Sequence, residues 1–532
     1  MTLVQLGRAR ETRQASRSSR PVILTFPDTD LEMPGTYHLP LSILSVAAPL
    51  WEKYELVLYD QRVDPPEKYA DALARNPIAV GVSSMTGTQL YHGLELSRLA
   101  KQAGVPTIWG NWHPTLLPEQ TVAHPLVDYV VTREGEQAFA NLIARLAGGE
   151  TVEQKIWPGF VSNWDAIPPV PYHLVDCELY LYNAQYPHAR VLPFTFSRGC
   201  PFQCAYCATG NLVSKWRSME VDTAVARVEE LVRRYRLDIV KFTDENITTH
   251  PKRFQALAEG INGRFEWMIQ SRLDCIDRQD IDQIEKNGLR LLCSGLESGS
   301  PRVLEMIKKR ESVETYLRVN RRLAATNIRS TYNFIMAFPG ETWQDTMLSV
   351  ELGLKLVDEN PNCTLNPYYT FVPYPGCALA EQFEDRLPKR LEDWAQFDRF
   401  NAHTPFSEKH QFEISNIAFS SKFVGRRFAT KFPGNQRVAE FTEKLTYEWR
   451  RKDFGGEQWH RYREENIELM RDLFGDYAFD GVIKDRQTKA KNDYVAQRLA
   501  ETKMPHGPSV EAAAEDPANR EPVYQNVGAN DY

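Results

Sequence analysis

The stretch Ser197-Arg198-Gly199-Cys200-Pro201-Phe202-Gln203-Cys204-Ala205-Tyr206-Cys207 decides how the chain is interpreted. Its three cysteines have the spacing C-x-x-x-C-x-x-C and follow the apolar run 191–196. Three thiolates on one short loop can each bind one iron of a 4Fe–4S cluster. The fourth iron is then open, because no fourth cysteine follows at matching spacing. Thiolates also bind zinc, so a structural zinc loop with a distant fourth ligand is the alternative.

Length and composition limit the classes of protein. The 532 residues, 42% of them hydrophobic and 25% charged, indicate a globular chain of two or three domains. A net charge of −7 gives no basic excess for nucleic-acid binding. No run approaches the ~18 apolar residues of a membrane span, and eight cysteines, three of them clustered, do not resemble a secreted disulfide framework. We therefore expect a cytoplasmic protein without a membrane span.

The N-terminal region alternates strand-like and helix-like patterns. Residues 1–20 hold five arginines and one acidic residue, Glu11, and predict a disordered basic arm. Strands are expected over 22–26, 55–59, 78–82, 106–109 and 128–131, with helices over 91–103 and 136–146. This alternation predicts a doubly wound parallel sheet over 21–150, which binds ligands outside the carboxyl ends of its strands. The turns at those ends are 83–87, 110–114 and 132–136; taken alone, they are more readily explained as ordinary strand–helix loops.

The rest of the chain predicts a second α/β domain and a helical region. Residues 151–189, rich in proline and aromatic residues, predict a linker. Residues 190–380 contain six strand–helix units, the pattern of a partial (β/α) barrel whose chemistry gathers at the carboxyl ends of its strands. Helical patterns over 437–451 and 458–474 predict that residues 381–503 cap the barrel mouth. Residues 504–532 predict a disordered tail.

The cluster loop, with Tyr206 before its third cysteine, resembles the cluster motif of radical S-adenosylmethionine (SAM) enzymes. The stretches 243–246 (TDEN), 295–300 (GLESGS), 338–342 (FPGET) and 374–376 (YPG) resemble strand-end motifs of the same core. The resemblance implies a 4Fe–4S cluster on Cys200, Cys204 and Cys207, with SAM on the open iron. The implied SAM contacts are Tyr206, Asp244, Glu245, Gln270, Arg272, Glu297 and Ser298. Arg198 and the basic run 308–310 could also hold the carboxylate of SAM, but solvated charge is the favoured interpretation of the run.

The N-terminal turns resemble the cobalamin-binding domain that precedes many radical SAM domains. The stretches 110–115 (GNWHPT) and 135–136 (GE) are similar to its GGxHPT and GEGE sequences. The implied cobalamin contacts are Ser83, Ser84, Thr86, Gly110, His113, Glu134 and Gly135. The D-x-H-x-x-G motif, whose histidine ligates cobalt in methionine-synthase-like domains, is absent around all eleven histidines. We therefore expect no histidine on cobalt, and a structural or amide-contact role for His113.

Both modules together resemble the cobalamin-dependent (class B) radical SAM methyltransferases over roughly residues 20–380. The family mechanism implies that one SAM methylates cobalamin, while a second is cleaved to a radical that takes hydrogen from the substrate. We expect methyl transfer to an unactivated carbon or phosphorus of a small natural-product intermediate. The favoured substrate is a phosphonate or phosphinate of antibiotic biosynthesis, and the expected electron donor is a protein such as flavodoxin or ferredoxin.

Three other functions fit parts of the sequence. The nearest is a cyclase or oxidoreductase that uses the same cofactors on a tetrapyrrole. A methylthiotransferase is disfavoured, because its N-terminal domain should bring three more cluster cysteines and none precedes Cys177. A corrinoid or iron–sulfur carrier without catalysis is disfavoured by the SAM-like strand ends. No catalytic residue beyond the cofactor contacts is predicted.

Overall fold

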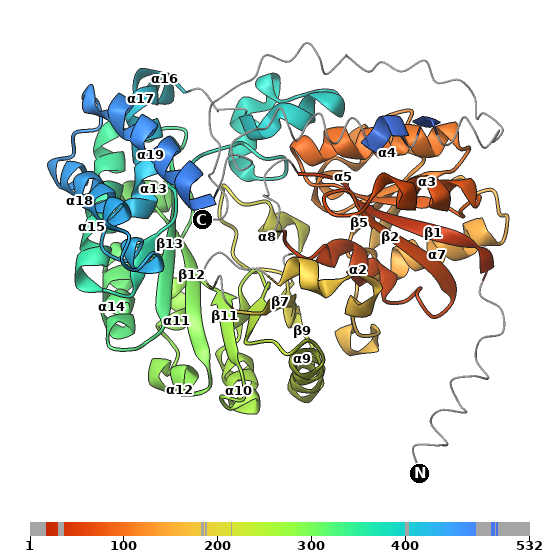
Figure 1. Cartoon of the computed structure of the whole chain (residues 1–532), viewed down its shortest axis with the longest axis horizontal. Helices are drawn as coiled ribbons and strands as arrows, with labels where there is room; N and C mark the ends of the chain where they lie inside the picture. The colour runs from red at the N-terminus through yellow and green to blue at the C-terminus, as the bar shows by residue number, and fades with distance from the viewer. Residues whose placement is uncertain are drawn as a thin grey trace.

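The computed structural model describes residues 18–29, 37–181, 186, 189–213, 215–399, 404–474, 491–494 and 496–497. Two sheets lie side by side, the first in red and orange and the second in yellow and green (Figure 1). The strands of both sheets run parallel. This is the arrangement that alternating strands and helices predict.

The first sheet has the strand order β2-β1-β3-β4-β5-β6. The bounds are β1 Ser18–Phe26, β2 Tyr54–Asp60, β3 Val80–Ser83, β4 Thr107–Gly110, β5 Tyr129–Arg133 and β6 Ile156–Gly159. Leu24 joins the core formed with α2 (Leu41–Ala47) and α7 (Gly135–Ala147), whereas its neighbour Ile23 joins the core formed with α3 (Pro66–Ala74) and α4 (Thr88–Gln102). Successive side chains of a strand point to opposite faces. The sheet is therefore covered on both faces, and the predicted doubly wound fold is confirmed.

Two predicted boundaries differ from the structure. Strand β1 begins at Ser18, so residues 18–20 belong to the sheet rather than to the predicted arm, whose residues 1–17 lie outside the described residues. Strand β6 lies inside the predicted linker and forms the edge of the first sheet. It contains Pro158, which an edge strand tolerates because one side of it needs no ladder hydrogen bond. The described linker then continues through short 3₁₀ turns, η1 (Trp164–Ala166), η2 (Tyr172–Leu174) and η3 (Cys177–Tyr180).

The second sheet has the strand order β14-β13-β12-β11-β10-β7, and β15 also pairs with β13. The strands are β7 Val191–Phe194, β10 Ile239–Phe242, β11 Glu266–Gln270, β12 Leu289–Glu297, β13 Arg329–Met336, β14 Cys363–Leu365 and β15 Tyr369–Thr370. The helices between them are α9 Val221–Tyr235, α10 Pro251–Ile261, α11 Leu273–Ile276, α12 Ile281–Lys286, α13 Pro301–Met306, α14 Val313–Ala324 and α15 Trp343–Glu359. Six parallel strands with intervening helices confirm the predicted partial barrel.

The two faces of this second sheet carry different cores. Val240 and Phe242 of β10 pack in the large core together with the helices. Ile239, from the opposite face, forms a separate small core with Val191, Met268 and Leu291. Because these four residues come from neighbouring strands and lie away from the helices, they line the inside of the barrel.

The cluster loop lies between β7 and α9. It contains a short antiparallel ribbon of β8 (Ser197–Arg198) and β9 (Arg217–Ser218), and helix α8 (Thr209–Leu212). The cysteines follow β8 directly, at the end of the barrel where strand β7 terminates.

The C-terminal region is helical, as predicted, but it contacts both domains. Its elements are η5 Ala378–Arg386, η6 Glu392–Arg399, α16 Pro405–Lys409, α17 Gln411–Ser420, η7 Ser421–Phe423, η8 Ala429–Lys431, α18 Gln436–Arg451 and α19 Gln458–Phe474. Trp394 and Phe397 of η6 join the core that contains α4, and α18 packs on α15. Lys491 donates a hydrogen bond to the carbonyl oxygen of Gln61 in the first domain (2.8 Å). The predicted tail 504–532 lies outside the described residues.

Among the helices that the structure describes, none combines the length and the apolar character that a membrane crossing requires.

Candidate functional site

The backbone of the cluster loop is held from several sides. Gly199 has a φ of +94°, and a Cβ there would lie 2.5 Å from the carbonyl oxygen of Lys215, so only glycine fits. Its N–H donates to Glu245 (3.0 Å), the N–H of Cys200 donates to the carbonyl of Val213 (3.0 Å), and that of Ala205 to the carbonyl of Ile307 (2.8 Å). These contacts hold the backbone of the loop in one conformation.

The three loop cysteines are half-buried and form no disulfide. Burial raises the pKa of Cys200 to about 11 and also raises that of Cys204, so these two thiols are protonated unless a metal stabilises their thiolates. A cube offers each thiolate its own iron, so the sulfurs need not meet at one point. In the described part of the chain, no three His, Cys, Asp or Glu side chains converge as ligands of a single metal ion would. The donor set fits a 4Fe–4S cluster with one open iron.

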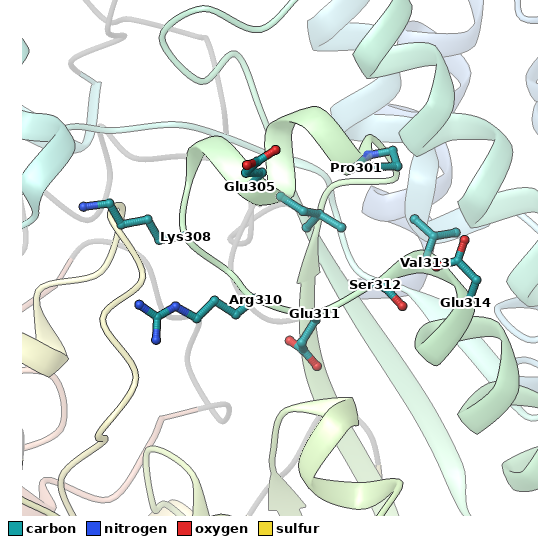
Figure 2. Close-up of a pocket in the computed structure, with 9 residues that line it drawn as sticks. Pro301, Glu305, Lys308, Arg310, Glu311, Ser312, Val313 and Glu314 are labelled. Atoms are coloured by element: carbon teal, nitrogen blue, oxygen red, sulfur yellow. The ribbon is translucent and has the colours of Figure 1, made fainter.

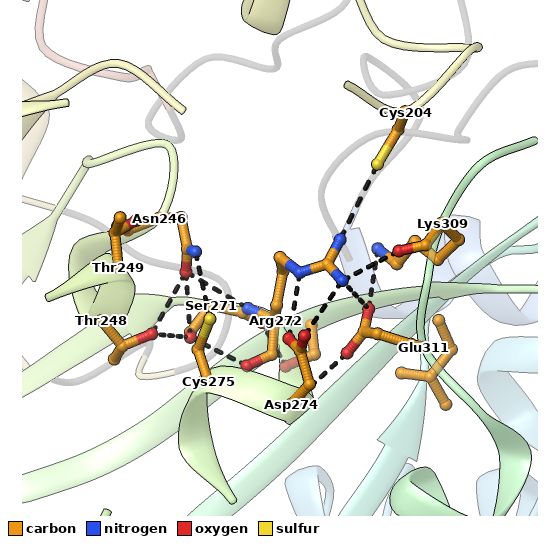
Figure 3. A network of polar contacts seen from close by, with 12 residues as sticks. Cys204, Asn246, Thr248, Thr249, Ser271, Arg272, Asp274, Cys275, Lys309 and Glu311 are labelled. Carbon is orange, nitrogen blue, oxygen red and sulfur yellow. Dashed lines mark hydrogen bonds and ion pairs between the residues drawn. The ribbon is translucent and has the colours of Figure 1, made fainter. Parts of the chain in front are cut away.

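Arg272 connects the cluster loop to the barrel (Figure 3). Its Nη1 donates to the Sγ of Cys204 (3.8 Å), and its guanidinium lies 3.9 Å from the centre of the Phe202 ring. The same group donates to Asp274 (3.0 and 3.2 Å) and to the carbonyl oxygen of Lys309 (2.8 Å). Arg272 was predicted to contact SAM; in this structure its side chain holds the cluster loop, and only 8% of it is exposed.

A buried polar cluster joins Tyr206, Glu297 and Lys309. Glu297 has a φ of +68° and folds back over Gly295, where a Cβ would lie 2.1 Å from its carboxylate. It accepts hydrogen bonds from the hydroxyl of Tyr206 (2.8 Å) and from Nζ of Lys309 (3.2 Å). Lys309, 5% exposed, also pairs with Glu311 (3.3 Å). The predicted SAM contacts Tyr206 and Glu297 thus meet beside the cysteines.

The sequence raised Lys309 only as a lesser candidate for the carboxylate of SAM, and the structure buries its side chain in the site. It lies in the basic run 308–310, which was interpreted as solvated, and this holds for its exposed neighbours Lys308 and Arg310. Those two line a cavity of about 410 Å³ at the loop between α13 and α14, together with Glu305 and Glu311 (Figure 2). Side chains of both charge signs line this cavity, so it has no clear preference for anions or cations.

The remaining predicted SAM contacts have different surroundings. Asp244 is buried and accepts from the N–H of Phe196 (3.2 Å) and from the N–H and hydroxyl of Ser197; burial raises its pKa to about 7. Ser298 accepts from the N–H of Ser300 (3.1 Å) and supports the turn after β12. Gln270 is exposed at the end of β11. Asp244 and Glu245 therefore shape the cluster loop, and Gln270 is available to a ligand.

The carboxyl edge of the first sheet contains the predicted cobalamin contacts. The hydroxyl of Ser83 bonds to that of Ser42 (2.8 Å) and accepts from the amide of Asn111 (3.0 Å). His113 is fully buried, its Nδ1 bonds to the hydroxyl of Thr86 (3.0 Å), and burial lowers its pKa to about 3, so it is neutral. The edge also includes Gly110 and Gly135, which end β4 and begin α7.

Two buried polar atoms at this edge, the hydroxyl of Ser84 and Nε2 of His113, have no hydrogen-bond partner among the described residues. Buried polar atoms normally have a partner. A cofactor with polar side groups, such as cobalamin, fits an edge that offers unpaired polar atoms.

Glu134, also predicted to contact cobalamin, directs its carboxylate elsewhere. Both of its oxygens pair with the guanidinium of Arg217 (2.6 and 2.9 Å), and one accepts from the N–H of Val161 (2.6 Å). Arg217 belongs to β9 of the cluster loop. The carboxylate therefore joins the first domain to the second.

Comparisons with known proteins agree with this architecture. The radical SAM superfamily model matches residues 194–352, and the B12 binding domain model matches residues 31–143. An uncharacterized methyltransferase of Pyrococcus horikoshii is 24% identical over 389 residues, 68% of this chain and 82% of the relative. The anaerobic magnesium-protoporphyrin IX monomethyl ester cyclase of Rubrivivax gelatinosus is 25% identical over 355 residues, 62% of this chain and 61% of the relative.

One solved structure has the same fold over nearly its whole length. It is the radical SAM methyltransferase TsrM of Kitasatospora setae with cobalamin and a [4Fe-4S] cluster bound, 15% identical with a TM-score of 0.58. The match covers 85% of this chain and 98% of TsrM. Because both domain models match in this order and the cysteine loop fits a cluster, the chain belongs to the cobalamin-dependent radical SAM enzymes, whose cofactors are a 4Fe–4S cluster, SAM and cobalamin.

Proposed function

We propose that the protein transfers the methyl group of SAM, by way of cobalamin, to an unactivated carbon or phosphorus of a small substrate. The observation that carries this proposal is the direct junction between the two cofactor sites. Glu134, at the end of β5, pairs with Arg217 of the cluster loop. A junction at these two positions supports a reaction in which a methyl group passes from the cobalamin site to a substrate that is activated at the cluster site.

The residues of the site bind, orient and exclude water. When bound, the cluster and SAM supply a hydrogen-abstracting radical, and cobalamin supplies the methyl group. Tyr206, Glu297 and Lys309 form a buried, hydrogen-bonded wall beside the cysteines. Such a wall holds its shape while ligands exchange, because each polar group already has a partner.

The substrate that we favour is small and anionic, such as a phosphonate or phosphinate intermediate of antibiotic biosynthesis. Lys241 supports this class. It follows Ile239 by two positions on β10, so it faces the inside of the barrel with the small apolar core. It is half-buried, and among the described residues no carboxylate pairs with it. An anionic substrate would supply the missing partner.

The proposed reaction also needs a one-electron donor, and we propose a cytoplasmic flavodoxin or ferredoxin. The loop at 308–310 lies next to the cluster loop, because Ala205 donates to the carbonyl of Ile307 (2.8 Å). Lys308 and Arg310 are exposed, so this loop offers a donor an accessible surface close to the cysteines.

Anaerobic assays with SAM labelled in its methyl group test this proposal on phosphinate, phosphonate and tetrapyrrole candidates. We expect labelled product together with one S-adenosylhomocysteine and one 5′-deoxyadenosine per turnover. Lys241→Met should raise KM for an anionic substrate, whereas Lys252→Met, on the exposed face of α10, should not. Labelled product without 5′-deoxyadenosine would contradict the radical route and indicate polar methyl transfer.

A second candidate is a cyclase or oxidoreductase acting on a tetrapyrrole with the same cofactors. The similarity to the magnesium-protoporphyrin cyclase favours it. In the assay above, 5′-deoxyadenosine formed with a tetrapyrrole and without labelled product would support this candidate.

A further inference from the structure

Two arginines lie directly opposite each other on the ribbon that begins the cluster loop. In the antiparallel pair of β8 and β9, Arg198 is the partner of Arg217. Like charges directly opposite on two strands destabilise the pairing unless each has its own counter-charge. Arg198 also stands two positions before Cys200. Contacts that fix the position of Arg198 therefore also fix the position of Cys200, the first cluster ligand.

Both counter-charges come from the start of one helix in the other domain. Glu134 is the N-cap residue of α7, and Glu136 lies in its first turn. Glu134 binds Arg217 through two parallel contacts (2.6 and 2.9 Å), and Glu136 binds Arg198 (2.6 Å). The side chains of Glu134 and Arg217 are only 4% and 9% exposed. Buried, two-point pairs of this kind are far more restrictive than surface ion pairs.

An aromatic ring completes each pair. The guanidinium of Arg198 lies 4.2 Å from the centre of the Trp164 ring, and that of Arg217 lies 4.3 Å from the Phe160 ring. Both rings belong to the segment just after β6. Burial alone would raise the pKa of Glu136, but the charge and hydrogen bond of Arg198 outweigh it and lower that pKa. Each arginine is therefore held by one carboxylate and one aromatic ring.

We propose that these two ion pairs set the distance and orientation between the cluster loop and the cobalamin-binding edge. One pair would allow the ribbon to rotate, whereas two pairs on opposing strands fix its direction as well. Arg198, Arg217, Glu134 and Glu136 are then positioning residues for the transfer between the two cofactor sites. The expected effect of these residues on turnover rests on the proposed function. Their effect on the distance between the two sites rests on the geometry alone.

Charge reversal tests the inference in the full chain loaded with cluster and cobalamin. Arg217→Glu faces Glu134 with a like charge, and adding Glu134→Arg restores an opposite pair. The single variant should still cleave SAM but should form about 100-fold less methylated product per 5′-deoxyadenosine, since small misplacements of reacting groups cost about that much. The double variant should recover most of the loss. Arg233→Glu, in an exposed pair on α9, is the matched control and should change neither quantity.

A second readout does not depend on methyl transfer. Paramagnetic resonance of the reduced cluster and cob(II)alamin in the same molecule reports their magnetic interaction, which should weaken in Arg217→Glu and return in the double variant. If Arg217→Glu does not fold, Arg217→Lys, which keeps the charge but loses the second contact, should show a smaller change in the same direction. An unchanged magnetic interaction in a folded, loaded Arg217 variant would overturn the inference. If the magnetic interaction weakens in Arg217→Glu but the wild-type protein transfers no methyl group, the positioning role is supported and the proposed function is wrong.

Discussion

Replacing Arg272 should lower the reduction potential of the cluster. Arg272 places a positive charge 3.8 Å from the sulfur of Cys204 and donates a hydrogen bond to it. Charge and hydrogen bonds at the sulfurs are established determinants of cluster potentials. Both stabilise the reduced, more negative form. Arg272→Met removes both, and it leaves the neighbouring acids Asp274 and Glu311 without this counter-charge.

The size of the effect follows from the distance. At about 4 Å and an effective dielectric constant of about 20, two unit charges interact by about 4 kcal/mol. The added electron is shared over the cluster, so we take half of this, about 2 kcal/mol. For one electron that corresponds to a shift of roughly 90 mV to lower potential. Arg272→Lys keeps the charge and should shift the potential by less than half as much.

An anaerobic redox titration of the reconstituted full chain, followed by paramagnetic resonance, measures this shift. Iron content and absorbance must match the wild type, because Arg272 also supports the loop through Phe202. A fully loaded Arg272→Met variant whose reduction potential lies within about 20 mV of wild type would refute the electrostatic reasoning. A shift that small is well below the roughly 59 mV that corresponds to a tenfold change in a one-electron equilibrium.

Three further predictions concern the cluster, cobalamin and pH. Anaerobic reconstitution of Cys204→Ala should lose cluster absorbance and SAM cleavage, whereas Cys363→Ala, a buried cysteine of β14, should keep both; a full cluster in the Cys204 variant would contradict the assignment. His113→Ala should leave the base-off spectrum of bound cobalamin unchanged, because His113 is buried and bonded to Thr86; a histidine nitrogen on cobalt in the wild type would disprove this. Burial raises the pKa of Glu341 to about 7, so its contribution to stability is present below its unfolded pKa of about 4.3 and is lost as pH rises toward 7. Glu341→Gln should therefore flatten the fall in melting temperature between pH 5 and pH 8, and an unaltered pH profile would count against it.

The fold could be predicted because its strands are apolar runs that end at polar or glycine residues. Strand β6 was not predicted, because it has only four residues and contains Pro158. It therefore lacks the alternation of apolar and polar residues that marks a longer strand. For Lys309 the sequence favoured solvated charge over a contact with SAM, because a run of three cations is typical of solvated charge. Its burial depends on Glu297, whose backbone has an unusual positive φ.

The site was predictable where the residues lie close together in the sequence, as the three cysteines do. The contact between Glu134 and Arg217 spans 83 positions, and no local pattern reports it. The sequence placed Glu134 at the end of a strand, among the expected cobalamin contacts, but could not show that its carboxylate also lies at the domain junction. Such a residue shows its role only when both domains are in place.

The contact of η6 with α4 has a consequence for synthesis of the chain. The apolar face of α4 is completed by Trp394 and Phe397, which follow the end of that helix by about 290 residues. At ~5–20 residues per second, a ribosome needs roughly 15 to 60 s to make that stretch. During this interval the nascent N-terminal domain exposes the surface that η6 later covers. Nascent chains released before Phe397 should therefore bind chaperones and aggregate more readily than the finished protein.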